Sequence, residues 1–156
     1  MRTHQQPIGR RAENALIKRA IKVLEDRLEY ERISLSSPGV VRDFLTLRMA
    51  ELEHEVFTVI WLNAQNHLIA AEEMFRGSLT QTSVFPREIV KAALAANAAA
   101  AIFCHNHPSG ECRPSQSDKA LTQTLKAALA LVDVRVVDHF IVGGTKTFSF
   151  TERGLL

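Results

Sequence analysis

The stretch VFTVIWL at residues 56–62 decides the fold of this 156-residue chain. Apart from Thr58 it contains only β-branched, aromatic and aliphatic side chains. A continuous apolar run of this length is typical of a strand that is buried on both faces, because a half-exposed strand alternates polar and apolar residues. We therefore expect residues 56–62 to form a central strand of the sheet.

The segments that follow predict a hairpin and then a helix. Residues 63–66, NAQN, are typical of a turn, so residues 67–75 should return as the second strand of the hairpin. Pro86 is suited to the first position of a helix over residues 87–95. Asn97 can end that helix because asparagine tolerates the left-handed conformation.

The C-terminal half continues the alternation of strands and helices. Residues 99–104 predict a strand, and Ser115 begins a helix whose leucines and alanines recur at three- and four-residue steps. Residues 134–142 and 147–150 predict two further strands, joined by a tight turn around Gly143-Gly144. Strands interleaved with helices predict an α/β (α+β) fold with a mixed β-sheet flanked by helices.

Two helices are predicted before the first strand. Residues 11–31 place apolar side chains at helical spacing, and Ser36-Ser37-Pro38 offers an N-cap serine and a first-turn proline for a helix ending near Leu52. We divide the chain into an N-terminal helical extension, residues 1–34, and a single domain, residues 35–156.

Composition excludes several classes of protein. A hydrophobic fraction of 46% and a charged fraction of 23% are those of a globular protein. The longest apolar stretch, residues 92–104, is too short and too rich in alanine to span a bilayer. With no secretory signal at the start, we expect a cytoplasmic protein, in which Cys104 and Cys112 are thiols.

A formal net charge of +2 does not by itself indicate a nucleic-acid partner. Basic residues are dense over residues 2–32, but five acidic residues lie between them. This mixture favours a solvated helix face over a nucleic-acid patch, so a nucleic-acid partner has weak support. The sequence is compatible with a homo-oligomer but identifies no interface.

The sequence HNH at residues 105–107 follows the strand at 99–104 directly. Alternate residues of a strand point to the same side, so both histidines can approach one ion. Asp118, on the first turn of the next helix, could supply a third ligand. Zinc held by three protein ligands keeps a fourth position open for water, which is the arrangement of catalytic zinc sites.

Each part of this pattern also has a simpler interpretation. Two histidines one residue apart occur by chance, and Ser115 with Asp118 resembles a helix-capping box. The Pro-Ser-Gly sequence at residues 108–110 could be an ordinary turn. Asn106 should point away from the ion. His139 could support the site or be satisfied within the sheet.

Order and spacing together carry a family resemblance. Residues 105–118, HNHPSGECRPSQSD, contain H-x-H, seven residues, then S-x-x-D, which resembles the JAMM motif of JAB/MPN metalloproteases. With FPRE at residues 85–88, NAA at 97–99 and DH at 138–139, the chain resembles the bacterial RadC family over roughly residues 35–156. The resemblance implies the cytidine-deaminase-like architecture of JAB/MPN domains.

The resemblance also implies roles for particular residues. The implied zinc ligands are His105, His107 and Asp118. The family's glutamate falls on Glu55, with Glu53 as the alternative, and would collect the proton of the attacking water and pass it to the leaving amine. Ser115 would donate a hydrogen bond to the oxyanion. Without the family, a solvent-facing carboxylate at the start of a strand would be the preferred interpretation of Glu55.

These roles predict a zinc-dependent hydrolase of the JAMM type that cleaves a peptide or isopeptide bond, with a protein or peptide as its substrate. Loops such as residues 76–84 would set specificity. The alternative is a non-catalytic, zinc-containing accessory protein in DNA repair or other DNA metabolism. The helix-hairpin-helix region of longer relatives has no clear counterpart in the first thirty-five residues, which weakens a DNA-binding role.

Overall fold

In a computed structural model of the protein, β1 (Glu55–Leu62) is the predicted internal strand, and all of its residues are buried. The structure describes residues 9–30, 37–77 and 84–156. β1 lies second in a five-stranded sheet of order β2-β1-β3-β4-β5. The other strands are β2 (Leu68–Gly77), β3 (Ala100–Asn106), β4 (Arg135–Gly143) and β5 (Lys146–Ser149).

The sheet is mixed, as predicted. β3 and β4 run parallel, whereas the pairs β1–β2, β1–β3 and β4–β5 are antiparallel. A parallel pair needs a long crossover, and α4 (Gln116–Ala130) supplies it between β3 and β4. The chain therefore leaves β3, passes through a loop and enters α4 beside the end of that strand.

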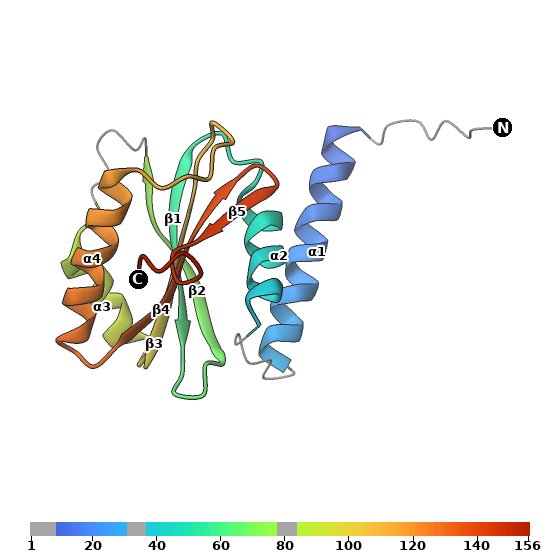
Figure 1. Ribbon diagram of the computed structural model, residues 1–156. Coiled ribbons are helices and arrows are strands. Elements are labelled where there is room, and N and C mark those ends of the chain that lie inside the picture. Colours follow the sequence, from blue (N-terminus) through green and yellow to red (C-terminus); the bar gives the residue numbers. More distant parts are fainter. Residues whose placement is uncertain (1–8, 31–36, 78–83) are drawn as a thin grey trace.

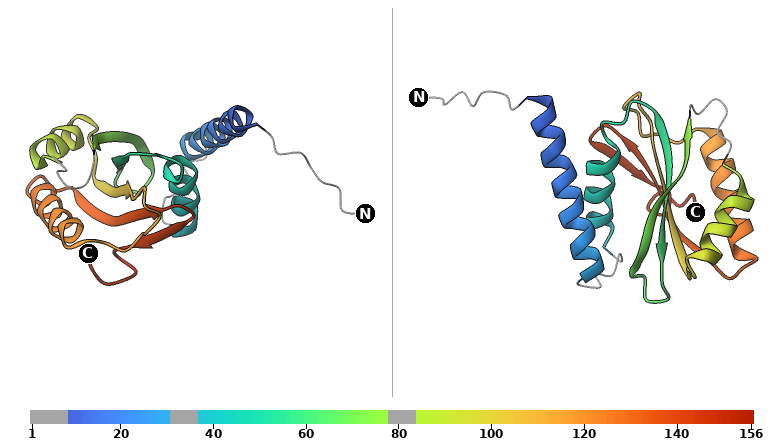
Figure 2. Two further views of the ribbon diagram at one scale, coloured as in Figure 1. Left: turned by 90° about the horizontal axis from the view of Figure 1, so that it is seen from above. Right: turned by 180° about the vertical axis from the view of Figure 1, so that it is seen from behind.

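Helices cover both faces of the sheet (Figures 1 and 2). On one face, α2 (Pro38–Met49) packs Phe44 and Leu45 against Ile60 and Ile102. On the other face, α3 (Pro86–Ala95) and α4 pack against the alternate residues of the same strands. The second face includes Phe57, Val59, Trp61, Ala101 and Phe103. Two apolar faces explain why β1 has no polar alternation.

α1 (Arg10–Tyr30) lies on the outer side of α2 (Figure 2), and it also contacts the edge strand β2. Its partly buried Ile21 and Leu24 pack against the core beneath α2, and Glu25 forms an ion pair with Arg48 at 2.9 Å. The predicted boundary between extension and domain falls at residues 34–35, outside the described residues, and stays a prediction.

Most predicted elements are confirmed, with two corrections. The second helix ends at Met49 rather than near Leu52, because the chain turns there to begin β1. β3 continues past Cys104 instead of entering a loop: His105 pairs with β1 and β4, and Asn106 pairs with β4. Asn97 has the predicted left-handed conformation, with φ of 50°.

Ser37 is the N-cap of α2, but it makes no side-chain capping hydrogen bond. Ser36 and residues 78–83 of the predicted specificity loop lie outside the described residues. Within the described part of the chain, none of the helices combines the length and apolar character needed to cross a membrane.

Candidate metal centre

Strand register brings the predicted site residues together. Phe57 of β1 is the partner of His105 in β3. Continuing this antiparallel register by two residues brings Glu55 opposite His107, one at the start of β1 and the other just past the end of β3. Because strand side chains alternate, Glu55 shares the α3–α4 face of the sheet with Phe57.

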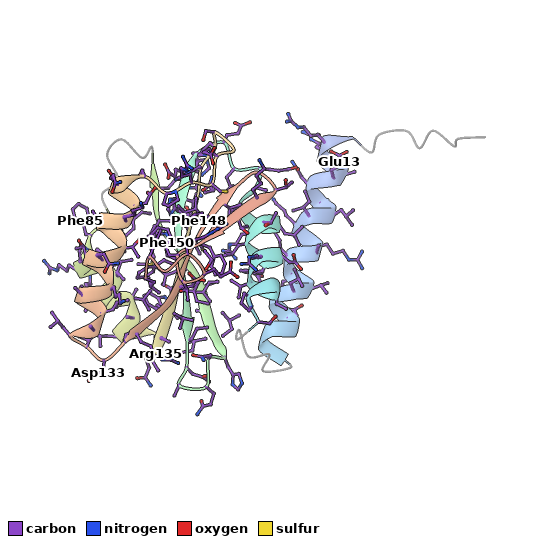
Figure 3. All side chains as sticks on the ribbon, in the orientation of Figure 1. Glu13, Phe85, Asp133, Arg135, Phe148 and Phe150 are labelled. Atoms are coloured by element: carbon purple, nitrogen blue, oxygen red, sulfur yellow. The ribbon has the colours of Figure 1, made fainter. Side chains whose placement is uncertain are left out.

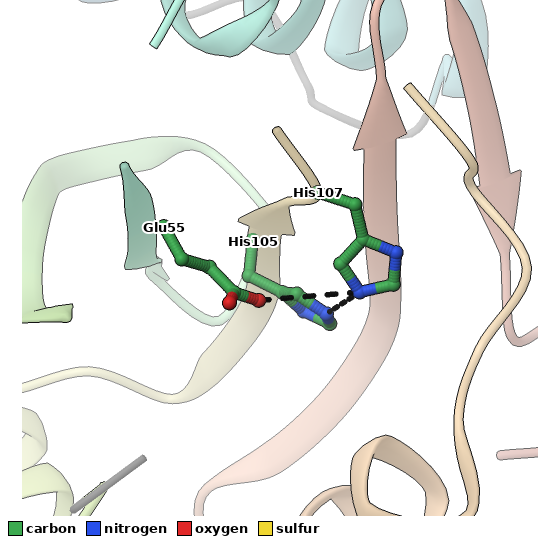
Figure 4. Close-up of side chains that lie close together, drawn as sticks. All are labelled: Glu55, His105 and His107. Atoms are coloured by element: carbon green, nitrogen blue, oxygen red, sulfur yellow. Dashed lines mark hydrogen bonds and ion pairs between the residues drawn. The ribbon is translucent and has the colours of Figure 1, made fainter. Parts of the chain in front are cut away.

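The polar atoms of these side chains converge (Figure 4). His105 Nε2 lies 3.1 Å from His107 Nε2, and Glu55 Oε1 lies 4.0 Å from His107 Nε2. Glu55, His105 and His107 each offer one ligand atom, and these atoms lie within 4.8 Å of one another. Asp118 approaches the same two nitrogens, with Oδ1 3.3 Å from His105 and Oδ2 3.6 Å from His107.

These separations are compatible with a metal site. For metal–ligand bonds of about 2.0–2.1 Å, two ligand atoms of a tetrahedron lie about 3.3 Å apart. The His105–His107 separation of 3.1 Å is close to that value, and the two oxygens of Asp118 lie 3.3 Å from His105 and 3.6 Å from His107. Glu55 Oε1 lies 4.0 Å from His107 Nε2 and also belongs to the group of atoms that could hold a metal ion.

The outer ring nitrogen of His107 is held by a backbone group. His107 Nδ1 lies 2.7 Å from the carbonyl oxygen of Glu111, and a carbonyl only accepts hydrogen bonds. Nδ1 therefore carries a proton, and Nε2 faces His105 and Asp118. Such a partner is the usual means of orienting a histidine that binds metal.

The loop that supplies this carbonyl packs tightly against β4. A Cβ atom on Gly143 would lie 2.6 Å from the carbonyl oxygen of Gly110 and 2.8 Å from the carbonyl carbon of Glu111. The backbone of His107 also donates to the carbonyl of Val142 at 2.8 Å. A glycine at position 143 thus permits the close approach that places the Glu111 carbonyl beside His107.

Ser115 and Asp118 form the capping box at the start of α4, so the structural interpretation of this pair is correct. Ser115 Oγ accepts from the backbone N–H of Asp118 at 3.0 Å, and Asp118 Oδ2 accepts from the backbone N–H of Ser115 at 2.6 Å. The same carboxylate faces both histidines, so capping and metal binding are compatible. The Ser115 hydroxyl donates to Asp118 Oδ2 at 2.7 Å.

Burial and hydrogen bonding set the charges of the cluster. Burial raises the pKa of Asp118, but the neighbouring His105 and His107 side chains outweigh burial and hold that pKa well below its usual range. Burial lowers the pKa of His105, whereas the hydrogen bond to Asp118 raises the pKa of His107. At neutral pH, Asp118 is ionised and His105 is neutral, which are the states that bind a cation.

Glu55 is buried, with 7% of its surface exposed, so the solvent-facing interpretation is wrong. Asn106 holds the backbone on both sides of it. The Asn106 side chain accepts from the N–H of Val56 at 2.8 Å and donates to the carbonyl of His54 at 2.9 Å. Asn106 thus points away from the cluster, as expected, and holds the start of β1. Glu53 is exposed.

Sequence reasoning left His139 open and missed Thr122. His139, on β4, is completely buried, and its Nε2 lies 2.8 Å from His105 Nδ1. Thr122 Oγ1 lies 2.6 Å from His139 Nδ1. His139 is therefore a partner of the site as well as a histidine satisfied within the fold. The position of Thr122, one helical turn after Asp118, was the available clue.

The two cysteines are free thiols. Cys104 lies on the α2 face of the sheet, opposite His105, and its thiol approaches the carbonyl oxygen of Thr58 at 3.4 Å. Burial raises the pKa of Cys104 to about 12. A thiol that stays protonated on the opposite face cannot be a ligand of this cluster.

Comparisons with known proteins agree with the resemblance. The family model described as "RadC-like JAB domain" matches residues 35–155. A UPF0758 protein of Dechloromonas aromatica is 57% identical over 149 residues, which cover 93% of this chain and 66% of that relative. The UPF0758 protein YeeS of Escherichia coli is 51% identical over 144 residues, covering 92% of this chain and 97% of that protein.

A second Escherichia coli relative, the UPF0758 protein YfjY, is 50% identical over 152 residues, covering 97% of this chain and 95% of its own length. The matched region contains Glu55, His105, His107 and Asp118, the four side chains of the cluster described above. The chain therefore belongs to the family of RadC-like JAB domains.

Proposed function

We propose that this chain is a zinc-dependent hydrolase of the JAMM type that cleaves a peptide or isopeptide bond. One observation carries the proposal. His105 Nε2, His107 Nε2 and the Asp118 carboxylate lie 3.1–3.6 Å apart, with the buried carboxylate of Glu55 next to them. Three ligand groups close enough to share one ion and a neighbouring acid–base group match the parts that metal-assisted hydrolysis needs.

The donor set favours zinc over the harder cations. Two imidazole nitrogens and one carboxylate suit zinc, whereas magnesium and calcium prefer oxygen ligands throughout. When bound, zinc would supply a Lewis acid that polarises the attacked carbonyl and lowers the pKa of water. Three protein ligands leave a position open, and His107 is partly exposed, so solvent can reach the cluster.

Glu55 has the position of the general base and acid. Its Oε1 lies 4.0 Å from His107 Nε2, close enough to contact a water molecule on the open side of the ligands. In the proposed reaction Glu55 accepts a proton from the attacking water and then donates it to the leaving amine. Asn106 keeps the carboxylate in place by holding the backbone on either side of it.

Ser115 would contribute at the entrance of the site. The residue is exposed, and its hydroxyl donates to Asp118 Oδ2. To stabilise an oxyanion, this hydroxyl would turn from Asp118 to the substrate while its oxygen stays at the N-cap of α4. We expect a protein or peptide as the substrate, because peptide or isopeptide hydrolysis is the reaction that the assigned residue roles serve.

A pair of glutamate variants tests the proposal. Zinc-loaded Glu55→Gln should retain the metal but lose cleavage of a peptide library and of isopeptide-linked lysine substrates, measured by mass spectrometry. Glu53→Gln is the matched control because Glu53 is exposed two residues earlier, and its cleavage should equal wild type.

Loss of zinc in Glu55→Gln would make Glu55 a ligand and overturn its assigned role. Equal cleavage in both variants would remove Glu55 from the mechanism. A zinc-loaded wild type that cleaves none of these substrates would contradict hydrolysis and favour the accessory role in DNA metabolism.

A further inference from the structure

We propose that Thr122 and His139 form a hydrogen-bond relay that sets which ring nitrogen of His105 carries the proton. The relay keeps the proton on His105 Nδ1 and leaves His105 Nε2 able to bind a metal ion. The inference rests on the proposed metal site, but it does not depend on hydrolysis. His139 and Thr122 are positioning residues, because they act through His105.

The direction of the relay follows from its first member. Thr122 Oγ1 lies 2.6 Å from the backbone carbonyl of Asp118, and a carbonyl can only accept. The single hydroxyl proton of Thr122 is thus donated one helical turn back, a common bond for threonine in a helix. Towards His139 Nδ1, also at 2.6 Å, Thr122 Oγ1 can only accept.

The remaining protons are then determined. His139 Nδ1 carries a proton and donates it to Thr122, so the neutral ring has a lone pair on Nε2. That lone pair accepts from His105 Nδ1 at 2.8 Å. His105 consequently has its own lone pair on Nε2, the atom that lies 3.1 Å from His107 Nε2 and 3.3 Å from Asp118 Oδ1.

The reversed relay is unfavourable. If Thr122 donated to His139, its oxygen and the Asp118 carbonyl oxygen would face each other at 2.6 Å without a proton between them. His139 would then donate to His105, and the proton on His105 Nε2 would block that atom as a ligand. The direction in which the Thr122 hydroxyl donates therefore determines whether His105 Nε2 can bind a metal ion.

The relay is buried and packed against aromatic rings. Thr122 and His139 have no exposed surface, and His105 has 2%. The ring of Phe150 stacks on His139 with centroids 4.6 Å apart, and Phe103 meets the same ring edge-on at 5.8 Å (Phe150 is labelled in Figure 3). Buried hydrogen bonds without competing water are costly to leave unmade, so the order of donors is strongly maintained.

The relay also joins two proposed ligands through α4. Asp118 offers its carboxylate to the cluster, and its backbone carbonyl accepts from Thr122 in the next turn. The first turns of α4 thus position one ligand and set the protonation of another. The other histidine, His107, receives its proton position from the Glu111 carbonyl and is independent of the relay.

Zinc affinity tests the relay with a matched pair of threonine variants. Thr122→Val removes the hydroxyl at constant shape. Thr124→Val is the control, because Thr124 makes the same bond to a carbonyl four residues back, at 3.0 Å, but is exposed. In competition with a chromophoric chelator, we expect Thr122→Val to weaken zinc binding by about 10–100-fold, the range for such outer partners, and Thr124→Val to match wild type.

Two variants of His139 and one spectrum complete the test. His139→Phe should lose affinity at least as much as Thr122→Val, and His139→Gln should recover part of it, because the amide oxygen can accept from His105. Nitrogen-15 spectra of zinc-free wild type should show His105 protonated on Nδ1. If the histidine variants fail to fold, the zinc affinity of Thr122→Val and the nitrogen-15 spectrum of wild type still test the relay.

A proton on His105 Nε2, or equal zinc affinity in Thr122→Val and Thr124→Val, would overturn the relay. Neither readout uses turnover. A wild type that binds zinc but hydrolyses nothing would therefore refute the proposed function and leave the relay standing.

Discussion

Replacement of Gly143 by alanine should weaken zinc binding without touching any proposed ligand. The new Cβ would lie 2.6 Å from the carbonyl oxygen of Gly110, whereas ordinary contacts begin at 3.4 Å, so the loop must retreat by about 0.8 Å. A shift of that size along the bond from His107 Nδ1 to the Glu111 carbonyl would lengthen it from 2.7 Å to about 3.5 Å, beyond a good hydrogen bond.

Loss of this bond should weaken zinc affinity by about 10–100-fold, and the crowding should lower the free energy of unfolding by about 1–3 kcal/mol. The assays are chelator competition and chemical denaturation of the zinc-free protein. Gly39→Ala is the control, because a Cβ there meets nothing closer than 3.9 Å. Unchanged zinc affinity in a folded Gly143→Ala protein would refute the argument that the close approach at Gly143 positions His107.

Two further results are expected. Asn106→Ala should lower the free energy of unfolding by about 2–3 kcal/mol, because it breaks one buried and one partly buried hydrogen bond beside Glu55. The variant should also reduce turnover more than zinc affinity, and denaturation and kinetics together check this. Asp118 raises the pKa of His107 above 6.5, whereas burial lowers that of His105. Zinc binding near pH 6.5 should therefore release about one proton, from His107, and zinc affinity should fall as the pH drops. Calorimetry in buffers of different ionisation enthalpy measures the number of protons released. Release of two protons per zinc ion would contradict the prediction.

Local patterns in the sequence were sufficient for much of the fold. The apolar run at residues 56–62 predicted an internal strand, and burial of the whole of β1 confirms it. Asn97 ended its helix as predicted because its conformation depends on its own side chain and backbone. The sheet also placed both histidines of the HNH sequence on one side, since the alternation of strand side chains is a local property.

Contacts between distant segments were not predictable in the same way. The bond from His105 to His139 joins residues thirty-four apart through a parallel strand pair, and its partner Thr122 lies on the crossover helix. The Glu111 carbonyl that orients His107 belongs to the backbone, so the identity of residue 111 does not predict this contact. Burial of Glu55 likewise depends on the register of β1 with β3, which residue patterns did not reveal; the family resemblance assigned Glu55 a role but not a position in the sheet.

Metal content is the most direct test of the account. Wild type and His107→Ala would be dialysed side by side against trace-metal-free buffer after loading with zinc, and analysed for elemental composition. The account predicts about one equivalent of zinc in wild type and far less in His107→Ala, because the variant loses one of three ligands. No retained metal in wild type, or equal zinc in both proteins, would contradict a metal centre at His105, His107 and Asp118.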